Sequence, residues 1–123
     1  MNTVEKNKMI NIFMGLKPVE IFGRFSISKD HVSVCCDTSD ETMESFSKST
    51  KYHSDWNWLM EVVDKIENLG YPIDIIQYHS IDKQFCGVYN NGKRIVTNIA
   101  ESKIEAVYNA CVEFIKWYNQ QKF

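Results

Sequence analysis

The sequence predicts an α+β fold in which three helices cover one antiparallel sheet of four to five strands, in two layers. Apolar side chains recur at helical spacing over residues 4–16, 55–69 and 103–120. Elsewhere they alternate with polar side chains, as in half-buried strands. An Asn-Gly pair, Asn91-Gly92, separates two alternating segments and predicts a tight hairpin. The 123 residues fit a single domain, 1–123.

The first helix is expected over residues 4–16, with Thr3 as its N-cap. Gly15 and Pro18 end it, because neither residue continues a helix readily. Its apolar stripe comprises Met9, Ile10, Phe13, Met14 and Leu16. We interpret this stripe as a core contact, with a partner-binding face as the alternative.

Residues 19–36 alternate with a period of two, which predicts strands. The alternating apolar residues are Val19, Ile21, Phe25, Ile27, Val32 and Val34. The segment from Ser28 to His31 predicts a turn, so that a hairpin joins the runs on either side of it. Residues 37–50 are rich in Ser, Thr and acidic side chains and predict a loop, either a surface excursion or a lid.

The second helix is expected over residues 55–69, capped by Ser54 or Asp55 and ended by Gly70. Its stripe comprises Trp56, Leu59, Met60, Val63, Ile66 and Leu69. Strands are expected over 73–78, 84–89 and 94–99.

The final helix, over 103–120, begins with a capping box formed by Ser102 and Glu105. Its expected buried face comprises Ile104, Val107, Tyr108, Cys111, Phe114, Ile115 and Tyr118.

The composition excludes several classes of protein. Fourteen basic and sixteen acidic side chains leave no positive excess for a duplex nucleic acid partner. No apolar run is long enough to span a membrane, and the first residues lack the apolar stretch of a signal peptide. The sequence therefore predicts a cytoplasmic protein.

The four cysteines are expected to be reduced core side chains. Cys35 and Cys36 follow His31, but this segment lacks the paired spacing of zinc sites. No metal and no cofactor are predicted.

Aromatic and polar side chains gather at the start of the second helix. A helix N-terminus attracts anions and aromatic rings offer stacking faces, so a nucleotide could bind there. The basic side chains that could assist are dispersed along the chain. The candidate ligand-binding residues are Tyr52, His53, Trp56, Trp58, Arg24, Lys93 and Arg94. The alternative is that the histidine and Asp55 cap the helix while the tryptophans fill the core.

Bulky aromatic side chains lie near the end of the last helix. Trp117 sits beside the apolar face, not within it, and Phe123 closes the chain. Both are candidate interface residues, with packing inside the chain as the alternative for Trp117. Three apolar helix faces exceed what one small sheet covers, which predicts a homo-oligomer, most simply a dimer. The alternative is that the first helix packs across the other two and covers the surplus.

Two segments, 52–71 and 103–119, carry a resemblance. They read Tyr52-His53-x-x-Trp56-x-Trp58-Leu59-Met60 and Lys103-Ile104-Glu105-Ala106-Val107-Tyr108-Asn109-Ala110 at their starts. Together they resemble small uncharacterised proteins of bacteriophages, prophages and mobile elements of gut-type bacteria. The resemblance implies a phage-type accessory protein in the cytoplasm of a bacterial host, acting against host defence.

The predicted function is that of a non-enzymatic binding protein that sequesters a small nucleotide signal. The first alternative is an inhibitor that docks on a host protein through an apolar patch. The second is a small hydrolase that uses His53 or His79. The motifs of phosphate loops, zinc proteases and nucleophile elbows are missing from the sequence, which favours binding over catalysis.

Overall fold

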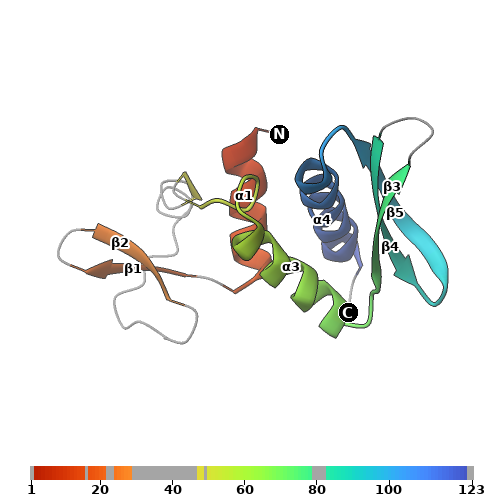
Figure 1. The fold of residues 1–123 in the computed structure, drawn as a ribbon. Helices are drawn as coiled ribbons and strands as arrows, with labels where there is room; N and C mark the ends of the chain where they lie inside the picture. The colour runs from red at the N-terminus through yellow and green to blue at the C-terminus, as the bar shows by residue number, and fades with distance from the viewer. Residues whose placement is uncertain are drawn as a thin grey trace. The chain divides into compact units, whose positions relative to one another are not determined.

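The fold is taken from a computed structural model of the chain (Figure 1). It describes residues 2–15, 17–21, 24–28, 47–48, 50–78 and 83–121, with backbone alone for 17–21, 24–28 and 78. The chain divides into two compact units, Met1–Thr50 and Lys51–Phe123. Each unit is described by itself, and the assignment of both to one domain stays a prediction.

The first unit contains a helix and a hairpin. Helix α1 spans Thr3–Phe13, and strands β1 (Lys17–Ile21) and β2 (Arg24–Ser28) pair antiparallel. The N-cap of α1 is Asn2, not Thr3: its Oδ1 accepts a hydrogen bond from the backbone N–H of Glu5 at 2.8 Å. Asn ranks with Ser and Asp as the best N-cap residue, so the helix starts one residue earlier than the prediction.

Helix α1 buries polar side chains that its apolar stripe did not predict. Its buried residues are Asn7, Ile10 and Asn11. The Asn7 side chain donates to the backbone carbonyl of Thr50 at 3.3 Å, and Asn11 donates to Oγ of Ser47 at 3.0 Å. These bonds tie Ser47 and Thr50 to the helix and satisfy both amides, since a buried amide is costly unless it is hydrogen-bonded.

The second unit holds two helices and a sheet in the order α3, β3, β4, β5, α4. Their bounds are Trp56–Asn68, Ile73–Tyr78, Lys83–Asn90, Lys93–Ala100 and Lys103–Gln120. The strands form an antiparallel meander in the order β3-β4-β5. In Figure 1, α4 lies along one face of this sheet and α3 lies beside α4 on the same side.

The core of the second unit lies between α4 and the sheet. Val88 and Cys86 of β4 are fully buried, as are Cys111 and Phe114 of α4. Ile104 and Tyr118 of the predicted face are only half-buried. Helix α4 instead buries Ala106, Ala110 and Val112 in addition to the rest of that face, because α3 covers it as well as the sheet. Its buried residues are Ala106, Val107, Tyr108, Ala110, Cys111, Val112, Phe114 and Ile115.

Helix α3 buries a narrower set of residues than its predicted apolar stripe. Leu59, Val63 and Ile66 are buried as expected, and Val62 is buried with them. The predicted stripe residues Trp56, Met60 and Leu69 are 38%, 39% and 42% exposed. The helix is thus covered along one side only.

The α+β class is confirmed, but the single sheet of four to five strands is wrong. The described strands form a three-stranded sheet and a separate two-stranded hairpin. Alternation predicted strands within 19–36 and gave bounds for the three strands of the second unit, yet it carries no information on which strands pair. The predicted turn at 28–31, the strand after it and most of the loop at 37–50 lie outside the described residues.

Local chemistry explains the element boundaries in the second unit. Asp55 caps α3 and Ser102 caps α4, each side chain accepting a backbone N–H. Asn91 and Gly92 have φ of 53° and 80°, the left-handed pair that a tight hairpin requires. None of the described helices combines the length and apolar composition needed to cross a bilayer.

Candidate functional site

Of the aromatic residues at the start of α3, Tyr52 belongs to the core and Trp58 is half-buried. Tyr52 is 1% exposed, and its ring meets the Trp58 ring edge-on at 5.2 Å. Burial, and secondarily the charge of Glu61, raises the pKa of the Tyr52 hydroxyl above its usual range. A ring enclosed in this way offers no open face for a base to stack on.

The more accessible members of this cluster are His53 and Trp56. His53 is exposed and its ring lies 6.1 Å from that of Tyr108, whose pKa burial raises to about 12. Oδ1 of Asp55 accepts the backbone N–H of Asn57 at 2.8 Å. Because this carboxylate already occupies the helix N-terminus, an anion at the same place would meet a negative charge.

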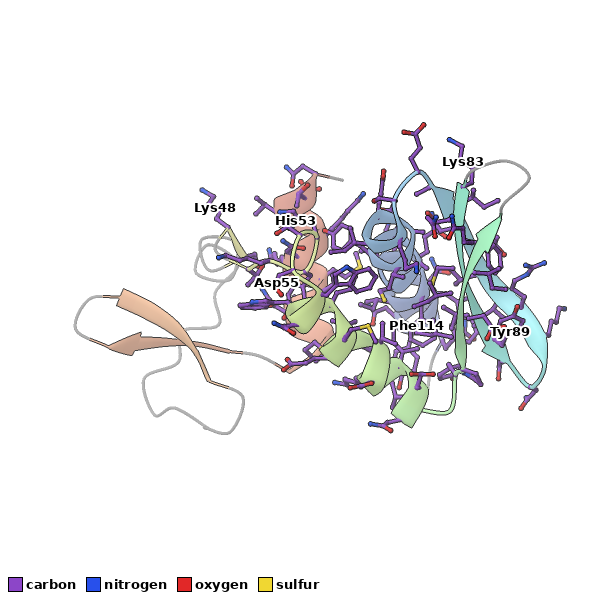
Figure 2. The ribbon with its side chains drawn as sticks, in the orientation of Figure 1. Lys48, His53, Asp55, Lys83, Tyr89 and Phe114 are labelled. Atoms are coloured by element: carbon purple, nitrogen blue, oxygen red, sulfur yellow. The ribbon has the colours of Figure 1, made fainter. Side chains whose placement is uncertain are left out.

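Within the second unit, the structure does not bring the basic candidates Lys93 and Arg94 to this cluster. Lys93 and Arg94 are the first residues of β5, and Arg94 is the register partner of Tyr89. Figure 2 shows Tyr89 at the sheet, on the far side of α4 from the start of α3, where His53 and Asp55 lie. The backbone of Arg24 lies in β2 of the other unit. His79 lies outside the described residues. Within the second unit, the candidate nucleotide site therefore has aromatic side chains but no basic side chain of the predicted set beside them.

The open face of the sheet, meaning the face opposite α4, carries a group of residues that alternation did not single out. In the ladder, Ile76 of β3 lies opposite Phe85 of β4, which lies opposite Ile99 of β5. We call these three residues the apolar row. Strand spacing makes the row about 10 Å long. Ile76 is 43% exposed and Ile99 is 52% exposed.

Phe85, in the middle of the row, is only 1% exposed. The guanidinium of Arg94 lies over its ring, 5.0 Å from the centroid. Gly87 makes room for this stacking, since a Cβ there would lie 2.9 Å from Cζ of Phe85 and 3.2 Å from Cδ of Arg94. The open face thus presents two exposed isoleucines with a positive charge between them.

A signal for the row was present in the sequence. Strand β3 contains Ile75 and Ile76 in succession, so both of its faces carry an apolar side chain. A strand with one solvated face ordinarily alternates apolar and polar residues. The second isoleucine is therefore the residue that could have revealed an apolar open face.

The predicted interface residue Trp117 takes part in packing within the chain. Its ring lies 5.7 Å from Tyr71 and 5.9 Å from Phe114, at the edge of an aromatic cluster that also includes Tyr118. Trp117 is half-buried. Phe123 lies outside the described residues, and the interface role of both residues stays a prediction.

Among the described residues, Cys86 and Cys111 are free thiols buried in the core, whereas Cys35 and Cys36 lie outside the described residues. Burial, and then the charge of Asp74, raises the pKa of Cys86 to about 12. Burial, and then Cys86, raises the pKa of Cys111 as well. Both thiols are therefore protonated at neutral pH, when they are poor nucleophiles and poor metal ligands. Within the described ranges, no three His, Cys, Asp or Glu side chains form a group that could hold a metal ion.

Comparison with known proteins adds no relative. No family model matches the chain, and neither the curated proteins nor the solved structures include a match. The resemblance to phage proteins stays a prediction.

Proposed function

We propose that this chain is a non-enzymatic binding protein that docks on another protein through the open face of its three-stranded sheet. The apolar row carries this proposal. Ile76 and Ile99 are each exposed by more than 40% on the same face, and the ladder places both beside Phe85. Clustered apolar side chains on a surface are typical of interaction sites.

The charges beside the row indicate the chemistry of the partner. Among the residues that the structure describes, Lys93 and Arg94 have no carboxylate at ion-pair distance. Arg is enriched at the centres of protein interfaces, where it combines stacking with charge. We therefore expect the partner to present an apolar side chain flanked by Asp or Glu, and the bacterial setting implied by the resemblance makes a host protein the expected source.

This proposal selects the first alternative that the sequence left open. Nucleotide sequestration requires stacking faces and cations in one concave site. Tyr52 is enclosed, Asp55 occupies the helix N-terminus, and Lys93 and Arg94 lie at the sheet. Sequestration stays a prediction that the next experiment also tests.

Replacement of Ile99 by Lys is expected to abolish docking. The immobilised chain is incubated with a lysate of a gut bacterium, and captured proteins are identified by mass spectrometry and then purified. We expect Ile99→Lys to bind the purified partner at least tenfold more weakly than the wild type, about 1.4 kcal/mol, by calorimetry. The lysine places a second charge on the row and removes an apolar contact.

Met60→Lys is the matched control, because Met60 is 39% exposed on α3 and lies off the row. It should bind the partner as the wild type does. Loss of binding in this control with retention in Ile99→Lys would move the surface to α3. A thermal-shift panel of linear and cyclic nucleotides covers sequestration. Stabilisation by several degrees that disappears in Trp56→Ala would contradict the docking proposal.

A further inference from the structure

Strand β3 is an edge strand whose one charged side chain is that of Asp74. It pairs with β4 alone among the described strands. Proteins commonly guard such edges with Lys, Pro or a bulge, because the free backbone groups otherwise pair with another chain. The sequence of β3, IDIIQY, contains neither Lys nor Pro. Ile75 and Ile76, which point to opposite faces, are 36% and 43% exposed.

The hydrogen bonds of β3 show which backbone groups are turned outward. The N–H of Tyr89 donates to the carbonyl of Pro72 at 2.9 Å, and this bond continues the register of β3 with β4. Bonded and non-bonded pairs alternate along an antiparallel ladder. Asp74 and Ile76 therefore bond to β4, whereas Ile73, Ile75 and Gln77 direct N–H and C=O to the free edge.

These three outward residues are arranged symmetrically about Ile75. We infer that β3 pairs antiparallel with β3 of a second copy of this chain, about a two-fold axis at Ile75. Ile75 then lies opposite Ile75 of the partner subunit, and Ile73 lies opposite Gln77 of the partner subunit. Every outward N–H and C=O in this stretch finds a partner, which is the condition for a closed, self-complementary dimer.

The same register suits the side chains. Residues directly opposite each other in an antiparallel pair lie on the same face. The two sheets therefore join into one continuous sheet, with α4 of each subunit on one side and both apolar rows on the other. Each Ile75 covers the other's exposed side chain.

The other edge of the sheet fits a second copy less well. Strand β5 begins with Lys93 and Arg94, both exposed. Positive side chains at an edge oppose strand addition. The dimer proposed here goes beyond docking on another protein and does not depend on it, since it uses the edge of β3 and not the open face.

Two charged variants of Ile75 test the dimer. The mass of the full chain is measured by light scattering from low micromolar to millimolar concentration. We expect this mass to rise to twice the 14.4 kDa of one chain. Ile75→Lys and Ile75→Glu should each fall to the single-chain mass, because like charges then meet at the axis. An equimolar mixture of the two should return to twice that mass, since Lys and Glu face each other.

Thr97→Lys, an exposed position on β5, is the control and should keep the doubled mass. A single-chain mass for the wild type throughout the range overturns the dimer. So does a doubled mass in Ile75→Lys, or a mixture that stays at the single-chain mass. Circular dichroism verifies the fold of each variant.

Amide hydrogen exchange of the wild type gives a test without substitution. The N–H groups of Ile75 and Gln77 should exchange slowly at high concentration and faster on dilution. Rapid exchange at all concentrations overturns the pairing. None of these readouts involves a docking partner, so failure of the dimer leaves the docking proposal standing, and the reverse also holds.

Discussion

Phe114→Ala is expected to lower the free energy of unfolding by about 3–5 kcal/mol, the usual cost of removing a buried Phe. Phe114 is fully buried on α4, and Figure 2 shows it beside the sheet. Its ring centroid lies 5.0 Å from Tyr71 and 5.6 Å from Tyr118. Truncation leaves a cavity that these large rings cannot fill without leaving their own contacts. Urea denaturation followed by circular dichroism measures the loss.

Met60→Ala is the control for Phe114→Ala. Met60 lies on α3 and is 39% exposed, so its truncation removes much less buried area. We expect the free energy of unfolding to change by no more than about 1 kcal/mol, because the high helix propensity of Ala offsets part of the lost contact. A loss in Phe114→Ala no larger than in this control would contradict the placement of Phe114 in the core.

Gly87→Val is expected to lower the free energy of unfolding by about 1–3 kcal/mol, the usual effect of overpacking a core. Gly87 lies in β4 two residues after Phe85, on the same face of the sheet, and a Cβ there would meet Cζ of Phe85 at 2.9 Å. Phe85 cannot yield easily because it is 1% exposed and lies under the Arg94 guanidinium. The substitution should therefore force Phe85 or Arg94 from its position. Urea denaturation again provides the measurement.

Thr97→Val and a double variant separate this clash from a general effect of valine. Thr97 is the register partner of Gly87 and is exposed, so Thr97→Val should leave stability within about 0.5 kcal/mol. The double variant Gly87→Ala with Phe85→Leu should lose less free energy of unfolding than the two single variants lose together. The shorter Leu side chain makes room for the new methyl group. Simple additivity would show that the two positions do not touch.

Local signals in the sequence were sufficient for the second unit's elements. Asn91-Gly92 predicted the β4–β5 hairpin, since few residue pairs accept positive φ at both positions. The three strands were predicted to within one residue of their observed ends. Asp55 and Ser102 identified the starts of α3 and α4 through the same short-range hydrogen bonds that the structure contains.

Features that depend on distant partners were not predictable. The separation of β1 and β2 from the larger sheet is set by pairing, which a period of two does not encode. Burial of Asn7 and Asn11 depends on residues 47–50, about forty positions away along the chain. A polar side chain that is satisfied only by tertiary contacts looks in sequence like a surface residue.

In the candidate site too, the sequence identified residue types, whereas their burial and neighbours depend on tertiary contacts. Aromatic composition pointed to Tyr52 and Trp58, but Tyr52 is buried in the core, where its ring packs edge-on against the half-buried Trp58. The basic residues Lys93 and Arg94 were identified from charge alone, and it is the cross-strand register that sets Arg94 over Phe85. Binding residues whose positions depend on strand pairing need the ladder as well as the sequence.

We infer that Ile76 and Ile99, the two exposed residues of the apolar row, serve binding and are not needed for folding. The free energy of unfolding of Ile99→Lys, measured by urea denaturation of the chain alone, tests this most directly. Ile99 is 52% exposed, so we expect a free energy of unfolding within about 0.5 kcal/mol of the wild-type value. A loss above about 2 kcal/mol, the cost of removing a buried aliphatic side chain, would contradict it, because the open face would then be part of the core.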